Sequence, residues 1–118
     1  MTNNLVDMAI LEEMRDTTDP DFALELIDTY IDDSAELIEA MRSALTAGDA
    51  DAFRRAAHSL KSNSATVGAA ELSSMAKDLE RMGRDGELKD AQPTMEAAAS
   101  MFEQVREALE RAKHDLHA

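Results

Sequence analysis

Residues 57–80 read AHSLKSNSATVGAAELSSMAKDLE, and this stretch shows two helical periods separated by a glycine, Gly68. Apolar and small residues recur every three or four positions on each side of that glycine, which is the spacing of one face of an α-helix. Because glycine commonly follows the end of a helix, the stretch predicts a helix, a tight turn and a second helix. The two faces consist of Phe53, Ala57, Leu60, Ser64 and Val67 before the glycine and of Leu72, Met75, Leu79 and Met82 after it.

Three further segments with helical periodicity complete the chain. Pro20 is expected to be the first helical residue of the longest segment, with Asp19 as its N-cap, and Asp49 is expected to cap the next helix. All four glycines are expected between helices, so that a turn runs from Gly83 to Gly86. The expected helices span about residues 5–16, 20–47, 50–66 and 69–82, and the last begins between Glu87 and Pro93 and ends near Lys113.

The two longest segments each carry an apolar stripe that is expected to be buried. The stripe of residues 20–47 is predicted to be Phe22, Leu26, Tyr30, Leu37, Met41 and Leu45, widened by Ile27, Ile31 and Ile38. The stripe of the last segment is predicted to be Met95, Ala98, Phe102, Val105, Leu109 and Ala112.

The composition favours packed helices over a sheet. Apolar residues make up 44% of the chain but aromatic residues only 3%, so the core consists of Leu, Ile, Met, Val and Ala. No segment shows the alternation of a strand. Four long amphipathic helices with short connections bury their stripes most simply on one another. We therefore predict an all-α fold for residues 1–118 as a single domain: an antiparallel up-down four-helix bundle with a short extra N-terminal helix.

The composition also excludes several classes of partner. A net charge of −13 argues against nucleic acid, because phosphate binding requires a basic surface. The absence of cysteine excludes disulfides and thiolate metal sites and fits a reducing compartment. No apolar run approaches the roughly 20 residues of a membrane span, and no basic segment precedes an apolar one as in a secretory signal. We expect a cytoplasmic monomer that binds neither nucleic acid nor membrane.

His58 is the candidate functional residue, because it lies away from the apolar stripe of its helix. Its helical neighbours are two cations, Arg54 and Lys61, and two small residues, Ser62 and Ala65. An imidazole surrounded by positive charge and little bulk suits transient contact with an anion. The alternative is an ordinary solvated histidine on a charged helix face.

The charge along the chain supports an anionic partner for this region. Residues 52–89 are the one segment in which bases outnumber acids, whereas the segments before and after it are acidic. A locally positive patch on a negative body orients an acidic partner and repels others.

The sequence around His58 resembles the histidine-containing phosphotransfer (HPt) domain family. The family's pattern is an Ala-His-x-Leu-Lys-Gly core, a glycine ten residues after the histidine, and a Leu-Glu pair near the end of the next helix. The helical layout from about residue 5 to residue 113 is also similar, so the resemblance covers nearly the whole chain. Ser62 departs from the pattern, which often has glycine there, but serine is also small and keeps the face open. The matching residues are Ala57, His58, Leu60, Lys61, Gly68, Leu79 and Glu80.

The resemblance implies a phosphorelay carrier in two-component signalling. His58 would take a phosphoryl group from an aspartyl phosphate of a receiver domain and pass it to another aspartate. A neutral imidazole nitrogen is a nucleophile at neutral pH, and Lys61, one turn along, is placed to offset charge on the phosphoryl oxygens. The resemblance also implies that Glu80 orients the ring nitrogen that does not react. The implied partners are response-regulator receiver domains and a hybrid sensor kinase.

The partner is expected to dock around His58, where the small Ser62 and Ala65 allow close approach. The chain has no Gly-rich phosphate loop, so no nucleotide site, enzymatic activity or cofactor is expected, and Mg²⁺ is expected only on the receiver domain. His114 and His117 have a spacing that could hold a metal, but no further ligand pattern supports a metal site. The expected docking surface comprises Arg54, Arg55, Ser62, Ala65, Gly68, Lys77 and Arg81.

Two other functions stay open at this point. A helical module that binds receiver domains without transfer would not need both His58 and Lys61. A purely structural bundle in an oligomer would expose a large apolar patch, which the polar outer faces of these helices do not indicate.

Overall fold

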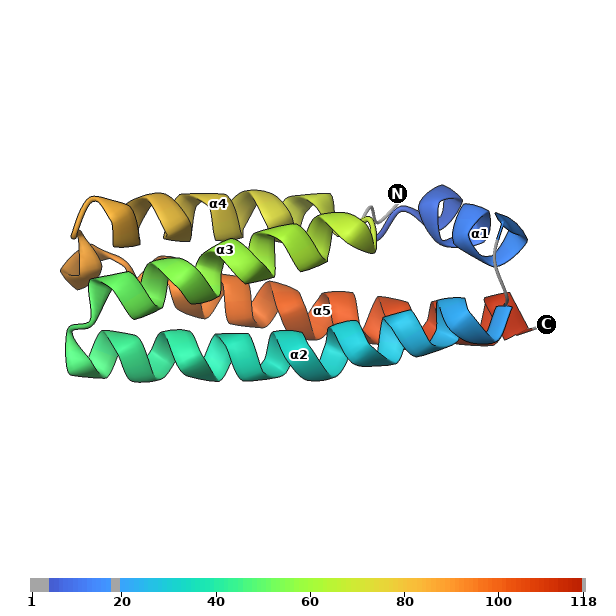
Figure 1. Ribbon diagram of the computed structural model, residues 1–118, viewed down its shortest axis with the longest axis horizontal. Helices are drawn as coiled ribbons and strands as arrows, with labels where there is room; N and C mark the ends of the chain where they lie inside the picture. The colour runs from blue at the N-terminus through green and yellow to red at the C-terminus, as the bar shows by residue number, and fades with distance from the viewer. Residues whose placement is uncertain (1–4, 18–19, 118) are drawn as a thin grey trace.

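The chain forms a bundle of long helices, shown in Figure 1 as a computed structural model that describes residues 5–17 and 20–117. The helix bounds are close to the predicted ones. The helices are α1 (Met8–Thr17), α2 (Pro20–Ala47), α3 (Ala50–Thr66), α4 (Ala70–Arg84) and α5 (Gln92–His117), with a short 3₁₀ helix, η1 (Leu88–Asp90), before α5.

The four long helices run alternately up and down, as in the all-α, antiparallel up-down bundle that the sequence predicts. In Figure 1, α2 and α4 run in one direction and α3 and α5 in the other. Each helix packs on the next in the order α2, α3, α4, α5, and α5 packs back on α2, so α3 and α5 are diagonal to each other. The short α1 lies beyond the ends of α3 and α4 and packs on α2 and α5. In the described part of the chain, no helix is both long and apolar enough to cross a membrane.

The core confirms the predicted stripe of α5 and corrects that of α2. All six predicted positions of α5 are buried, from Met95 to Ala112. In α2, however, Phe22 is 49% exposed, and Leu37 and Leu45 only flank the core. The buried face is centred about one position later. This face consists of Ala23, Ile27, Tyr30, Ser34, Ile38, Met41 and Ala44.

The caps and connections decide where the helices end. Asp49 caps α3 as predicted, since its carboxylate accepts a hydrogen bond of 3.0 Å from the amide of Ala52. The predicted cap at Asp19 lies outside the described residues. Gly83 is a correction: it lies inside α4 and is buried, so the turn begins only after Arg84. Gly83 therefore serves close packing and not a chain reversal.

Gly68 ends α3 as predicted and also anchors the start of the chain. Its φ of +79° is a left-handed conformation that favours glycine, and a Cβ atom there would lie 2.8 Å from the backbone nitrogen of Asp7. Its carbonyl accepts a hydrogen bond of 3.0 Å from the same Asp7 amide. The turn between α3 and α4 thus holds the residue that precedes α1.

We expect Gly68→Ala to lower the free energy of unfolding by about 2 kcal/mol or more, because left-handed strain of roughly 1–2 kcal/mol adds to the clash with Asp7. Gly48→Ala is the matched control, since Gly48 has a similar φ of +70° but open space around its Cβ position. Urea denaturation of both variants measures the difference. Equal losses for the two would show that the contact with Asp7 contributes nothing.

Candidate functional site

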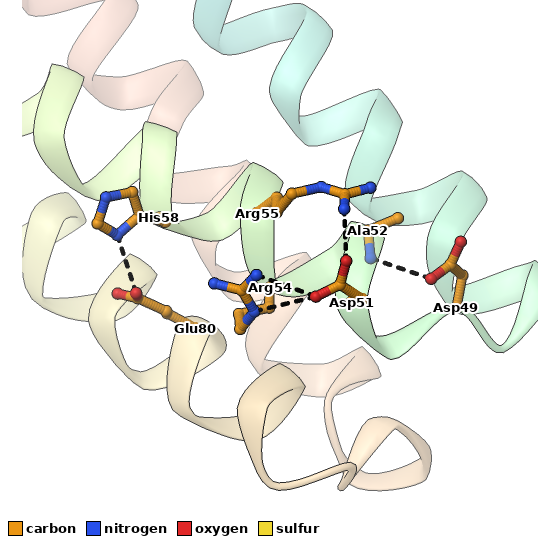
Figure 2. Close-up of polar contacts among 7 residues, drawn as sticks. All are labelled: Asp49, Asp51, Ala52, Arg54, Arg55, His58 and Glu80. Atoms are coloured by element: carbon orange, nitrogen blue, oxygen red, sulfur yellow. Dashed lines mark hydrogen bonds and ion pairs between the residues drawn. The ribbon is translucent and has the colours of Figure 1, made fainter.

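His58 projects from α3 toward α4, where it meets Glu80 (Figure 2). The His58 side chain is 55% exposed, and its Nδ1 atom lies 2.9 Å from Oε2 of Glu80. The helical period accounts for this exposure, because Ala57 and Leu60 on either side of the histidine are completely buried. The structure thus brings together two of the predicted site residues from two helices.

Lys61 binds the second oxygen of the same carboxylate. Its Nζ atom lies 2.8 Å from Oε1 of Glu80, whose side chain is only 15% exposed. One carboxylate therefore binds both the imidazole and the ammonium group of α3. Sequence analysis predicted a role for each of the three residues but not the ion pair between Lys61 and Glu80.

The surroundings of Glu80 favour its charged form. The hydrogen bond from Lys61 lowers the pKa of the Glu80 carboxyl most, and the hydrogen bond from His58 lowers it further, against the opposing effect of burial. Because this pKa is lower in the folded than in the unfolded state, the contacts stabilise the fold above the unfolded-state pKa. That contribution is lost as the pH falls through the folded-state pKa.

The charge of Glu80 fixes the tautomer of the histidine. An ionised carboxylate only accepts hydrogen bonds, so in the neutral ring the Nδ1 atom of His58 carries the proton and donates it to Glu80. The lone pair is then on Nε2, the nitrogen that Glu80 does not bind. The arrangement is an exposed ring with one unprotonated nitrogen, and a carboxylate of the neighbouring helix binds its other nitrogen.

The small residues beside His58 are exposed, as predicted. Ser62 and Ala65 both lie on the solvent side of α3, one and two turns after the histidine. Gly68, by contrast, is buried against Asp7, so its predicted place on the docking surface is wrong. The open face next to His58 therefore stops before the turn that follows α3.

Two predicted docking arginines are held by an aspartate that sequence analysis did not single out. Arg54 Nη2 lies 2.9 Å from Oδ1 of Asp51, and Arg55 binds the other oxygen, Oδ2 (Figure 2). The hydrogen bond from Arg54 is the largest cause of a lowered pKa of Asp51, and the charge of Arg55 acts in the same direction. The sequence could have predicted these ion pairs, since acidic and basic residues three or four positions apart pair on a helix.

Further cations surround Glu80 on α4. Lys77 and Arg81, both predicted docking residues, are exposed. They line a pocket of about 200 Å³ together with Lys61, Asp78, Glu80 and Arg84. Arg81 also lies 3.8 Å from Glu87, at the distance of a weak surface ion pair. Basic groups thus extend from the site along the outer face of α4.

Residues 5–17 and 20–117 contain no group of three or more His, Cys, Asp or Glu residues that could hold a metal ion. The Oε atoms of Glu80 are engaged by His58 and Lys61.

Three solved structures share the fold of this chain. Histidine-containing phosphotransfer protein B (HptB) from Pseudomonas aeruginosa PAO1 is 32% identical, with a TM-score of 0.90 over 97% of this chain and 98% of that one. A putative histidine-containing phosphotransfer protein from rice is 21% identical, with a TM-score of 0.82 over 97% of this chain and 84% of that one. The HPT domain of a sensor hybrid histidine kinase from Shewanella is 17% identical, with a TM-score of 0.79 over 98% of both chains. The comparison with curated proteins found no match.

The chain shares its helical bundle with these structures, and its exposed histidine is bound by a carboxylate from the neighbouring helix. The Hpt domain model matches residues 25–115, which include α3, α4 and most of α2 and α5. The chain belongs to the Hpt domain family, whose members are histidine phosphotransfer carriers in phosphorelays.

Proposed function

We propose that this chain carries a phosphoryl group on Nε2 of His58 between the aspartates of two receiver domains. In the forward step, the Nε2 lone pair attacks the phosphorus of an aspartyl phosphate, the N–P bond forms, and the O–P bond breaks to release the aspartate carboxylate. In the return step, the carboxylate of a second receiver attacks the same phosphorus and the ring nitrogen leaves. The donor is a receiver domain of a hybrid sensor kinase, and the acceptor belongs to a response regulator.

The hydrogen bond between His58 and Glu80 is the observation that carries this proposal. With Glu80 ionised, this contact favours the tautomer with the proton on Nδ1, which supports Nε2 as the nucleophile. When Nε2 forms the N–P bond while Nδ1 keeps its proton, the ring gains positive charge. The ionised Glu80, 2.9 Å from Nδ1, offsets that charge in both directions of transfer.

Lys61 supplies the opposite charge, for the phosphoryl oxygens. It lies on the same face of α3, three residues after His58, and its ammonium group has three donors, of which Glu80 needs one. No group of this chain acts on a nucleotide or a metal in the proposed reaction, and Mg²⁺ is expected on the receiver domain alone.

The direct test is phosphoryl transfer from a panel of receiver domains that have been phosphorylated with a small-molecule donor. We expect at least one of them to leave a phosphoryl group on this chain that is labile in acid and stable in alkali, as a phosphohistidine is. Binding of receivers without any transfer would instead support a non-transferring module. Neither binding nor transfer across a broad panel would favour a structural bundle.

We expect Lys61→Ala to slow transfer about a hundredfold and to change the dissociation constant for the receiver little, because a positioned charge acts mainly in the transition state. Lys89→Ala is the matched control, since it removes an exposed cation of η1 that is not part of the expected docking surface. Stopped-flow transfer at several receiver concentrations separates the rate constant from the affinity. An unchanged rate constant, or an effect confined to the dissociation constant, would refute this role.

A further inference from the structure

The backbones of α3 and α4 are in direct contact one turn away from the site. Gly83 of α4 is buried, and a Cβ atom placed on it would lie 2.9 Å from both Cα and N of Arg54 and 3.0 Å from its Cβ. These are backbone atoms and the first side-chain carbon of α3. They cannot turn aside as the end of a flexible side chain can, so a larger residue at position 83 has to push the helices apart.

This contact and the His58–Glu80 hydrogen bond are adjacent on the same interface. Arg54 lies one turn before His58 on α3, and Gly83 lies one turn after Glu80 on α4. Because the two helices run in opposite directions, the two pairs lie side by side, about one helical turn apart. A change in the distance between α3 and α4 at Gly83 therefore also changes the distance between Glu80 and His58.

A second contact fixes the interface on the other side of the site. The hydroxyl of Ser73 on α4 donates a hydrogen bond of 2.8 Å to the carbonyl of Lys61 on α3. The site thus lies between a backbone contact at Gly83 and a hydrogen bond at Ser73. Both hold α4 at a set distance from α3.

We propose that Gly83 is a positioning residue that holds the Glu80 carboxylate at hydrogen-bonding distance from Nδ1 of His58. The relevance of Gly83 to phosphoryl transfer rests on the proposed function. Its effect on the distance between Glu80 and His58 does not rest on that function. Ordinary contact of a Cβ atom begins at 3.4 Å, so a methyl group at position 83 moves α4 outward by about half an ångström. A hydrogen bond of 2.9 Å then stretches beyond the usual range, and Nδ1 loses its preference for the proton.

The test is Gly83→Ala, with Gly86→Ala as its control. Gly86 lies three residues after Gly83 and beyond the end of α4. A Cβ atom there meets nothing within 4 Å, although its φ of +72° strains an alanine. The control thus adds the same methyl group and some loss of stability without moving α4 against α3. The ¹⁵N shifts of the His58 ring report the tautomer in the free protein, and Glu80→Gln provides the reference for a weakened contact.

We expect Gly83→Ala to shift the ring signals of His58 toward those of Glu80→Gln, and Gly86→Ala to leave them as in the wild type. We also expect the transfer rate constant to fall about tenfold in Gly83→Ala, with an unchanged dissociation constant for the receiver. Wild-type ring signals in folded Gly83→Ala would overturn the proposal. If Gly83→Ala does not fold in buffer, the ring signals of both glycine variants are recorded in a stabilising osmolyte such as sucrose, and wild-type signals of Gly83→Ala there would overturn the proposal equally.

The two readouts keep this inference separate from the proposed function. The ring signals need no receiver domain, so they test the positioning role even if the chain accepts no phosphoryl group. A wild-type protein without transfer, but with the expected ring signals in both glycine variants, would refute the proposed function and leave the positioning role in place.

Discussion

The His58→Gln variant is expected to accept no phosphoryl group from any receiver that phosphorylates the wild type. Glutamine has no basic ring nitrogen, so it offers no lone pair in the place of Nε2. The fold should persist, because the His58 side chain is 55% exposed and a glutamine amide still donates a hydrogen bond. Surface substitutions of this kind change the free energy of unfolding by about 0.5 kcal/mol or less.

The measurement is the acid-labile, alkali-stable phosphate left on each protein after equal exposure to a phosphorylated receiver. His114→Gln is the matched control, because it removes an exposed histidine from α5 and should accept phosphate as the wild type does. Equal labelling of His58→Gln and the wild type would show that another residue is the acceptor. A marked loss of helical signal in circular dichroism would show instead that His58 is structural.

The helical periodicity was sufficient to predict the fold, but not the exact face of every helix. In α5 the stripe alternates cleanly with polar residues, and all of its predicted positions are buried. In α2 large apolar residues occupy neighbouring positions, and the choice between them depends on which helices pack on either side. The buried polar Ser34, and Tyr30 with its hydrogen bond of 2.9 Å to Ser64, lie on the true face. The periodicity of apolar residues alone does not identify a buried face that also contains polar side chains.

The site was predictable to the extent that it depends on short spacings and on the family's pattern. His58, Lys61 and the exposed Ser62 and Ala65 are related by helical turns, which a sequence specifies directly. The contact with Glu80 was expected only from the resemblance, since it joins residues 22 positions apart.

The two glycines show what the sequence alone could not predict. Both Gly68 and Gly83 were predicted at helix ends, but only Gly68 follows the end of a helix, while Gly83 lies inside α4. Each also fits closely against another segment, Asp7 for Gly68 and Arg54 for Gly83. The sequence does not distinguish a glycine that close packing requires from a glycine that a turn requires. Only the arrangement of the helices in space separates the two uses.

Ala65→Trp is expected to prevent docking of the receiver while leaving the bundle intact. In the proposed transfer the receiver's aspartate has to come within bonding distance of His58, which requires an unobstructed face beside the histidine. Ala65 lies two turns after His58 and is exposed, so an indole ring there projects into the partner and not into the core. We expect a loss of affinity of about a hundredfold, equivalent to roughly 2.7 kcal/mol.

Ala97→Trp is the control for this variant, because Ala97 is exposed on α5, the helix diagonal to α3. Titration of a receiver domain by calorimetry, or by NMR with the labelled chain, gives the dissociation constant of each variant at low and moderate salt. Steric exclusion should weaken binding of Ala65→Trp equally at both salt concentrations, since screening acts on the encounter of charged surfaces and not on shape. The association rate of the wild type should fall with salt, because cations such as Lys77 and Arg81 lie around the site. Wild-type affinity in Ala65→Trp would mean that the receiver approaches His58 from the side of α4, across the basic outer face that Lys77, Arg81 and Arg84 form there.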